Sequence, residues 1–564
     1  MDLYGISVSG GVGFGKIYVF DPQLPRIREE RASGDGEKER FSAAVREAGR
    51  QLAQTRERLA EKDPDQAQIF DAHAELLEDE EILEEIDCLL SDGFTACWAV
   101  ESVFSGFADI LESSGDEMIR QRGADLRDVK KRLLRCLLGI PSPDLSQLSE
   151  PVIIAAKELN PSDTASMDAG HIAGIAAEQG GTTSHVAILA KTLGIPTVLG
   201  IDGLLSRVKH GEVALLDAEE NALRLGSGEE LESQYQIKVQ LFREKAERLA
   251  KYAGRSGRTA DGTRVYLGAN IGSAETGELL SAQNADFVGL FRSEFLYMHA
   301  DHLPTEEEQF EAYKKALSAM NGRRVTIRTL DIGGDKQLPY LPQKPEMNPF
   351  LGLRALRLCL ERPELFRTQL RALLRASVYG KLDIMFPMVS GLEEFRQARD
   401  LTLRLAEELR ESGSPVADDV RIGLMIEIPS IALMADQAAA EADFASVGTN
   451  DLCQYLTAAD RGNPDVSRYY QSYHPALFRT LEMIARAFNA AGKELSVCGE
   501  LGGDAKAAPV LVGLGIRKLS MNPAAITEVK AALDALSLAD MEGLAREVCG
   551  CTTAKETERI ITKN

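Results

Sequence analysis

Residues 255–564 contain a repeated pattern that leaves few possible folds. Short apolar runs, each ending in polar or ionisable residues, alternate with segments in which apolar residues recur at helical spacing. There are eight such runs: Val265–Asn270, Phe287–Arg292, Val325–Asp331, Leu382–Pro387, Ile422–Glu427, Phe444–Asp451, Leu495–Glu500 and Lys518–Met521. Eight strand-then-helix units in a segment of this length predict a (β/α)8 TIM barrel. Active sites of that fold lie at the C-terminal strand ends, where these polar residues occur.

Cations are frequent at or after these strand ends. The candidates for binding an anionic ligand are Arg292, Arg328, Lys336, Arg354 and Arg461. The planar guanidinium group of arginine can bind phosphate or carboxylate through two parallel hydrogen bonds. Two glycines stand beside the lysine in the run 331–336, and they would let the backbone approach a phosphate closely.

Three further strand-end residues suggest chemistry. Glu427 and Asp451 end the fifth and sixth runs, and two carboxylates plus substrate oxygens would complete a Mg²⁺ site. Either residue alone could belong to a surface ion pair, but their joint placement favours the metal site. Cys498 lies in the seventh run, between its apolar part and Gly499-Glu500, and the residues alone leave two interpretations equally open. It is either a buried, inert barrel thiol or a proton donor or acceptor.

A second distinctive stretch runs from Gly180 to Gly200. Thr183 and Ser184 are good N-cap residues, and a helix is predicted from His185 to Gly194, where a glycine and the following Pro196 end it. Val186, Leu189 and Leu193 are expected on one face of this helix. His185 would then stand in the first turn, where free N–H groups favour an anion such as a phosphoryl group on the ring.

The chain before this stretch divides into two patterns. Residues 3–20 predict a hairpin of two strands. Within it, Gly10 to Lys16 imitates a nucleotide-binding P-loop, but Ile17 replaces the required Ser or Thr and no helix pattern follows. Residues 36–139 predict an antiparallel bundle of about four helices, with breaks near residues 63, 92 and 123. The acidic segment 75–87 is either a solvated face or a docking surface for a small carrier protein.

Composition excludes several classes of protein. The net charge of −23 over 564 residues argues against nucleic-acid binding. The eight cysteines show no metal-ligand or disulfide spacing, which is typical of a reduced, cytoplasmic chain. The first residues lack the pattern of a signal peptide, and no apolar run is long enough to predict a membrane span.

The motifs together resemble one family. The run from Gly180 to His185, followed by a small-residue helix and Gly-Ile-Pro196, is similar to the phosphohistidine motif of enzymes that use phosphoenolpyruvate (PEP). Over nearly the whole chain, the order of motifs resembles Enzyme I of the sugar phosphotransferase system, the PEP–protein phosphotransferase. The barrel motifs concerned are Gly289–Leu296, Pro304–Phe310, Arg328–Lys336, Asn348–Arg354, Gly448–Leu452, Asp460–Asn463 and Cys498–Leu501.

This resemblance implies a role for each candidate. His185 would accept the phosphoryl group of PEP, Cys498 would donate the proton that completes pyruvate, and Glu427 and Asp451 would bind Mg²⁺. The residues implied in PEP binding are Arg292, Arg328, Lys336, Arg354, Asn450, Asp451 and Arg461. The implied partners are the carrier protein HPr, bound by the helical bundle, and a second copy of the chain, bound through the barrel.

The chain departs from the family pattern at two positions. Ser293 stands where threonine is usual, which keeps a hydroxyl group. Thr182 replaces an arginine that is common before Thr-Ser-His, which removes a charge near His185.

The expected architecture is α/β and multidomain. Residues 1–22 and 143–226 are predicted to form the phosphohistidine swivelling domain, and residues 23–142 an inserted HPr-binding bundle. Residues 227–254 are predicted to form a linker helix and residues 255–564 the PEP-binding, dimer-forming barrel.

Three alternatives compete with this interpretation. PEP synthase and pyruvate phosphate dikinase carry a large ATP-binding domain ahead of the histidine domain, whereas a bundle and a hairpin are expected here. The regulatory, nitrogen-type phosphotransferase usually has an added N-terminal sensory domain, which is not expected here. A catalytically silent scaffold that binds a carrier is the third alternative, and the intact candidates His185, Glu427, Asp451 and Cys498 argue against it.

Overall fold

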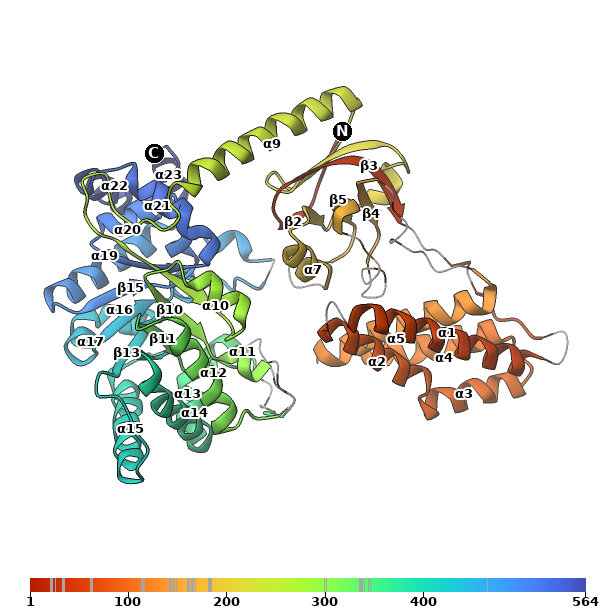
Figure 1. Ribbon diagram of the computed structural model, residues 1–564, viewed down its shortest axis with the longest axis horizontal. Helices are drawn as coiled ribbons and strands as arrows, with labels where there is room; N and C mark the ends of the chain where they lie inside the picture. Colours follow the sequence, from red (N-terminus) through yellow and green to blue (C-terminus); the bar gives the residue numbers. More distant parts are fainter. Residues whose placement is uncertain are drawn as a thin grey trace. The chain divides into compact units, whose positions relative to one another are not determined.

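The structure is a computed structural model of the 564-residue chain. It describes all residues except 21–23, 26, 33–35, 61–63, 113–116, 141–144, 146–147, 149, 160–162, 164–166, 168, 181–184, 299, 301, 334–337, 339, 343, 345, 464 and 564. Side chains are also not described at 58–60, 64–69, 71, 112, 117–121, 124, 169, 185, 188, 192 and 246. Two compact units are present, Met1–Glu244 and Lys245–Asn564 (Figure 1).

The second unit is a closed barrel of eight parallel strands, which confirms the predicted fold class. Each of the eight predicted runs forms a strand, because a parallel strand covered on both faces needs a continuous apolar run. The register closes where β16 pairs with β9, with Leu519 opposite Leu267. The strands are β9 (Tyr266–Ile271), β10 (Phe287–Arg292), β11 (Val325–Arg328), β12 (Leu382–Phe386), β13 (Arg421–Ile426), β14 (Phe444–Val447), β15 (Glu494–Val497) and β16 (Lys518–Met521).

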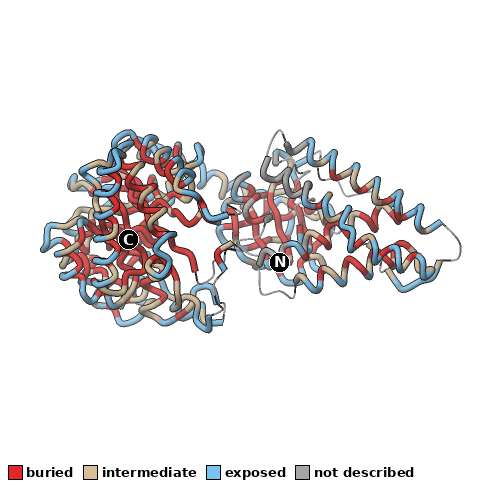
Figure 2. Tube along the Cα trace, turned by 90° about the horizontal axis from the view of Figure 1, so that it is seen from below, coloured by how far each residue is buried: buried red, intermediate tan, exposed pale blue. Residues whose placement is uncertain are grey.

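Helices surround the barrel and bury its outer face. They are α10 (Thr276–Ala282), α11 (Glu294–Met298), α12 (Glu306–Ala319), α13 (Ala355–Glu361), α14 (Pro363–Ala376), α15 (Leu392–Glu411), α16 (Pro429–Leu433), α17 (Ala435–Glu441), α18 (Thr449–Thr457), α19 (Pro475–Ala490), α20 (Ala508–Gly513), α21 (Ile526–Asp534), α22 (Leu538–Gly550) and α23 (Ala554–Ile561). The main apolar core lies between strands and helices, and Figure 2 shows the buried barrel segments in red. A smaller cluster fills the barrel interior: Leu290, Met385, Met425, Phe444 and Cys498.

The first unit contains an eight-stranded mixed sheet. Its order is β1-β8-β7-β3-β4-β5-β6-β2. Neighbouring residues of β4 enter different apolar clusters, Ile153 one and Ile154 the other, as expected for a sheet covered on both faces. The strands are β1 (Asp2–Tyr4), β2 (Ile6–Ser9), β3 (Val12–Phe20), β4 (Val152–Ala156), β5 (Ile172–Ala177), β6 (Thr197–Leu199), β7 (Val213–Asp217) and β8 (Ala222–Leu225).

The predicted N-terminal hairpin is wrong. Strand β2 pairs with β6, and β3 pairs with β4 and β7, so the two predicted partners do not pair with each other. Each strand finds a partner that lies far along the chain, which a local turn pattern does not reveal. Gly15 and Lys16 lie inside β3, and Lys16 pairs with Glu150 at 2.8 Å, so this stretch is not a phosphate-binding loop.

The bundle contains five described helices instead of about four. The additional break separates α2 from α3. There, Asp79 caps the N-terminus of α3 by accepting from the N–H groups of Glu81 (3.0 Å) and Ile82 (3.1 Å). The predicted break near Gly123 is also wrong, because that residue lies within α5. The helices are α1 (Glu37–Ala60), α2 (Pro64–Leu77), α3 (Glu80–Ser91), α4 (Ala96–Glu112) and α5 (Glu117–Leu138). His73, on α2, is fully buried, and its Nε2 lies 3.2 Å from Asp125, which supports a structural role.

The boundary between the two units falls within one long helix, α9 (Gly228–Ala250). Its earlier part is held in the first unit, where Lys238 pairs with Asp217 and Glu220. Its end is held in the second unit, where Lys245 pairs with Glu528 at 2.9 Å. The chain thus separates into two compact units at one point, inside this helix. The predicted domain boundaries at residues 142, 226 and 254 remain predictions.

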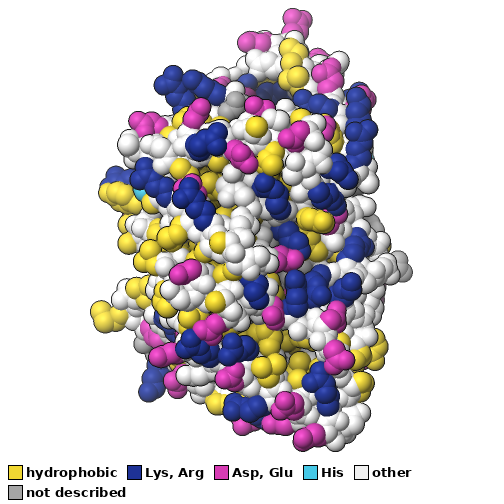
Figure 3. Space-filling model, turned by 90° about the vertical axis from the view of Figure 1, so that its left-hand side faces the viewer, with side chains coloured by type: hydrophobic (Ala, Val, Ile, Leu, Met, Phe, Trp, Pro, Cys, Tyr) yellow, Lys and Arg dark blue, Asp and Glu magenta, His cyan; other side chains and the backbone are white. Residues whose placement is uncertain are grey.

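Charged side chains are frequent on the surface, in agreement with the composition (Figure 3). Figure 3 shows basic and acidic side chains interspersed over one face of the molecule. Such mixing keeps any single-sign field on that face small. Across the described residues, no helix combines the length and the apolar character that a membrane span requires.

We predict that Gly13→Ala destabilises the first unit strongly. A Cβ atom at this position of β3 would lie 1.9 Å from the carbonyl oxygen of Ala173, so backbone would have to move. The expected loss is about 3 kcal/mol in free energy of unfolding, measured by urea titration. The matched control is Gly49→Ala within helix α1, where a Cβ meets nothing within 4 Å and alanine should add up to about 1 kcal/mol. Equal effects of the two substitutions would contradict this packing.

Candidate functional site

The C-terminal ends of the barrel strands gather the predicted site residues at one edge. Arg292 and Arg328 are the last residues of β10 and β11, and Glu427 and Cys498 directly follow β13 and β15. Asp451 lies in the first turn of α18, which begins two residues after β14. Because the strands are parallel, their carboxyl ends share one rim of the barrel.

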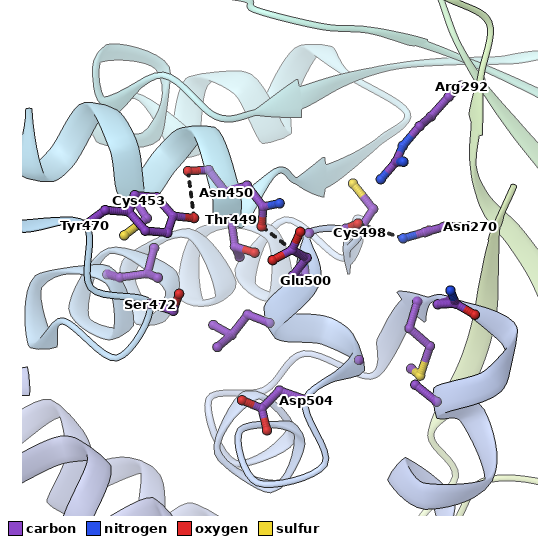
Figure 4. Close-up of a pocket in the computed structure, with 17 residues that line it drawn as sticks. Asn270, Arg292, Thr449, Asn450, Cys453, Tyr470, Ser472, Cys498, Glu500 and Asp504 are labelled. Atoms are coloured by element: carbon purple, nitrogen blue, oxygen red, sulfur yellow. Dashed lines mark hydrogen bonds between the residues drawn. The ribbon is translucent and has the colours of Figure 1, made fainter. Parts of the chain in front are cut away.

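A cavity of about 540 Å³ opens beside this rim. Arg292, Asn450 and Cys498 line it, and Figure 4 shows the Arg292 side chain pointing toward Cys498. Two hydrogen bonds fix its wall. The side-chain amide of Asn270 donates to the carbonyl of Cys498 at 2.9 Å, and the N–H of Glu500 donates to Oδ1 of Asn450 at 3.0 Å.

Arg328 is the centre of a buried ionic network. Its side chain is 8% exposed, its Nη2 donates to Glu294 and its Nη1 lies 2.9 Å from Oδ2 of Asp331. Burial opposes the positive charge, but the carboxylates of Glu294 and Asp331 outweigh it and raise the pKa of Arg328. The guanidinium is therefore permanently charged and rigidly held.

Arg354 continues this network from the segment that precedes α13. Its Nη2 donates to Oδ1 of Asp331 at 2.8 Å, and its Nη1 lies 3.8 Å from Oδ1 of Asp451. Burial again opposes the charge, and Asp331 with Asp451 outweighs it, so the pKa of Arg354 is raised. The guanidinium also lies over the ring of Phe350, at 5.8 Å from its centroid. Asp331 thus links two arginines from different segments.

Glu427 and Asp451 are both buried near this network. Oε1 of Glu427 accepts a hydrogen bond from the N–H of Met388 at 2.6 Å. Burial, Asp451 and Asp331 together raise the pKa of Glu427 to about 8. The protein therefore brings carboxylates together at a cost in repulsion that a bound cation would reduce.

Cys498 combines burial with a place in the cavity wall. The residue is 3% exposed, and its thiol lies 3.7 Å from the carbonyl of Val447. Burial raises the pKa of Cys498 to about 11. The sulfur therefore keeps its proton at neutral pH, as a proton donor must.

The structure places the remaining predicted residues less completely. His185 is the first residue of α7 (His185–Leu193), but its side chain is not described. Lys336 lies outside the described residues, as does Thr182. Arg461 follows α18 in an exposed segment, where its N–H donates to Gln454 at 3.1 Å.

Helix α7 is built largely as predicted. Gly194 has φ 66° after its last turn, and the N–H of Ile195 returns to the carbonyl of Ala190 at 2.9 Å, which ends the helix. Val186 and Leu189 are buried, and Leu193, predicted to lie on the same face, is 44% exposed. It is the last residue of the helix, directly before the terminating Gly194.

Two groups of the site lie outside the predicted set of residues: the carboxylate of Glu294 and the backbone N–H of Met388. Glu294 follows Arg292 and Ser293, and its position after a strand end was a signal for a site residue. The backbone N–H of Met388 gave no such signal, because a main-chain donor has no sequence signature. Ser293 is fully buried, and its hydroxyl accepts from the amide of Gln369 at 3.0 Å, so the hydroxyl kept at this position is used in packing.

Comparisons with protein families cover the chain in three parts. Residues 246–538 match the PEP-binding domain of PEP-utilising enzymes, residues 4–122 their N-terminal domain and residues 148–221 their mobile domain. The fold and the site thus define the class of PEP-utilising enzymes.

Full-length relatives narrow this class. The phosphoenolpyruvate-protein phosphotransferase of Staphylococcus carnosus is 43% identical over 567 residues, covering 99% of each chain. That of Listeria monocytogenes is 42% identical, covering 100% of this chain and 99% of the relative. A solved structure of an Enzyme I protein in solution is 32% identical and covers 43% of this chain and 99% of its own, with a TM-score of 0.39. On the full-length relatives, the chain belongs to the phosphoenolpyruvate–protein phosphotransferases, the Enzyme I family.

We predict that Glu294→Gln destabilises the barrel. Arg328 would lose a charged partner in a buried site, which should lower the free energy of unfolding by about 3 kcal/mol in urea titration. Glu311→Gln is the control, because its pair with Lys314 is solvent-exposed and should contribute under about 1 kcal/mol. A loss no larger than that of the control would show that Arg328 does not depend on Glu294.

Proposed function

We propose that the chain transfers the phosphoryl group of PEP to His185 and then to the histidine of the carrier protein HPr, as the first step of sugar uptake by the phosphotransferase system. The arrangement at the barrel rim is the observation that supports this proposal most strongly. A buried ionic network there contains Arg328, Asp331, Arg354 and Asp451. Beside it lies the cavity lined by Arg292 and Cys498. The membership in the Enzyme I family supports the reaction, and the cytoplasm is its proposed location.

The proposed chemistry breaks one bond and forms one at phosphorus. The bond between phosphorus and the enol oxygen of PEP breaks, and a nitrogen of the His185 imidazole takes the phosphoryl group. The oxygen keeps the electron pair, which leaves the enolate of pyruvate. The thiol of Cys498 then gives its proton to C3.

Substrate binding is assigned to cations and an amide. We assign Arg292 and Asn450, both in the cavity wall, to contacts with PEP. Arg328, Asp451 and Arg461 complete the proposed set, and Arg354 and Lys336 assist.

Glu427 and Asp451 fit a Mg²⁺ ion. Both carboxylates are buried, and Oδ1 of Asp451 has no hydrogen-bond partner among the described residues. No group of three or more potential ligands of the His, Cys, Asp and Glu type occurs in the described part of the chain, so oxygens of the substrate or of water would complete the coordination of the ion. When bound, Mg²⁺ would supply positive charge to the oxygens of the transferring group.

Two interaction surfaces belong to the proposal. Helix α3 is buried through Ile82, Ile86 and Leu90, which leaves Glu81, Glu84 and Glu85 exposed as a docking face for HPr. Homodimer formation through the barrel is supported by exposed apolar side chains on that unit: Leu280, Met298, Leu303, Met347 and Leu351.

The first test is PEP-dependent labelling. With Mg²⁺ and radiolabelled PEP, the wild type should take up acid-labile, base-stable label, and His185→Ala should take up none. Chelation of the metal should abolish the label, and added HPr should remove it from the protein. Label that moves only to a nitrogen-type carrier would favour the regulatory paralogue. An unlabelled wild type would leave a carrier-binding scaffold and end the enzyme proposal.

A second test addresses the proton donor. Cys498→Ala should lower the exchange of pyruvate C3 hydrogens in D₂O at least about a hundredfold, because general acid catalysis contributes about that much. Since the pKa of Cys498 is about 11, the wild-type exchange rate should not fall between about pH 7 and pH 9 through loss of this proton. Cys551→Ala is the control, a buried thiol at the end of α22. Unchanged exchange in Cys498→Ala would remove the assigned role.

A further inference from the structure

The hydroxyl group of Thr449 is buried in the cavity wall without a protein partner. Thr449 is the first residue of α18 and is 2% exposed, and it lines the same cavity as Arg292 and Cys498. Its Oγ1 has no hydrogen-bond partner among the described residues. A buried hydroxyl without a partner is unfavourable, so one kept beside a substrate cavity indicates a ligand group that completes it.

The helix itself cannot satisfy this hydroxyl. Threonines within helices of this chain donate to the carbonyl four residues earlier, as Thr402 does to Ala398 and Thr480 to Ala476, both at 2.8 Å. Because Thr449 begins its helix, the residue four positions earlier is Ala445, in strand β14. The usual intrahelical acceptor is therefore missing by construction.

The neighbouring groups are already committed to other bonds. Oδ1 of Asn450 accepts a hydrogen bond from the backbone N–H of Glu500. The backbone carbonyl oxygen of Asn450 accepts one from the hydroxyl of Tyr470 at 3.5 Å. Figure 4 shows Thr449 beside Asn450 and Glu500, with both of these bonds drawn.

Space for the hydroxyl is reserved by Gly499, the residue after the proposed proton donor. A Cβ atom on Gly499 would lie 2.0 Å from Oγ1 of Thr449 and 2.6 Å from its backbone nitrogen. Any side chain at position 499 would displace the hydroxyl or the helix start. The position of the Thr449 hydroxyl and the backbone next to Cys498 are thus fixed together.

We propose that Thr449 is a substrate-binding residue whose hydroxyl donates a hydrogen bond to an oxygen atom of the three-carbon acid, PEP or pyruvate. This contact would orient the acid so that C3 faces the Cys498 thiol. The inference rests on the proposed function, since it names a further residue of the same site. The hydroxyl would orient the substrate, which a methyl group packed at the same position would not do.

The test compares three variants of the full-length protein with PEP and Mg²⁺. Thr449→Val removes the hydroxyl and keeps the shape, and Thr449→Ser keeps the hydroxyl. Thr402→Val is the matched control, because it removes another buried threonine hydroxyl, one that lies on α15 and donates within the helix. Measured quantities are kcat and KM for phosphoryl transfer to HPr, C3 exchange of pyruvate in D₂O, and the melting temperature.

Thr449→Val is expected to lose about ten- to a hundredfold in kcat/KM and to lose C3 exchange in parallel, the size of effect given by one hydrogen bond to a charged substrate. Thr449→Ser should recover most of the loss, and Thr402→Val should keep wild-type kinetics. A loss below about twofold in Thr449→Val, or equal losses in Thr449→Val and Thr449→Ser, would overturn the proposal.

A further variant keeps the test decisive if Thr449→Val does not fold. Gly499→Ala should displace the hydroxyl and lower kcat/KM at least about tenfold, and wild-type kinetics in this variant would overturn the proposal. A wild type that fails to release pyruvate from PEP would refute the proposed function itself. An active wild type with unaffected variants would refute only the role of Thr449.

Discussion

The ion pairs that Asp331 makes with Arg328 and Arg354 hold the barrel rim together. Asp331 follows β11, Arg328 ends that strand and Arg354 precedes α13, so one carboxylate joins the strand to the segment that returns from its loop. Removing such charges from water costs several kcal/mol each, and only close pairing offsets that cost. Arg354 extends the network to Asp451 on α18. The positions of the candidate metal carboxylate and of two arginines are therefore coupled through electrostatics.

Backbone conformation adapts to this crowded rim. Ala355, directly after Arg354, has φ 52°, and Met388, whose N–H donates to Glu427, has φ 55°. Non-glycine residues with such positive φ angles carry a strain of about 1 kcal/mol or more, and strain of this kind concentrates at functional sites. Glycine is needed where a carboxylate fills the space, since a Cβ on Gly448 would lie 2.6 Å from Oε2 of Glu427.

The barrel could be predicted from the sequence because its signal is local and repeated. Each apolar run is long enough to form a strand, and the fold fixes which end carries the site, so the amino-acid pattern alone places Arg292, Glu427 and Cys498 together. The pairing of the first strands could not be predicted, because β2 and β3 bond to segments more than 130 residues away, a choice that no local turn pattern contains. The place of Glu294 after a strand end is visible in the sequence, but its partner Arg328 is not, since an ion-pair partner depends on which strands become neighbours.

Cations near the rim differ in what they can offer an anionic substrate. Arg328 and Arg354 are largely neutralised by Glu294, Asp331 and Asp451, and each keeps one buried donor without a hydrogen-bond partner among the described residues, Nε and Nη1 respectively. Arg292 lines the cavity, and no ion pair is found for it among the described residues. Under the proposed function, a doubly charged phosphate with an adjacent carboxylate needs charge that is not already balanced. Arg292 would supply that charge, and the paired arginines would fix the orientation of the substrate. In the proposed complex, electrostatic attraction and orientation would therefore fall to different residues at the same rim.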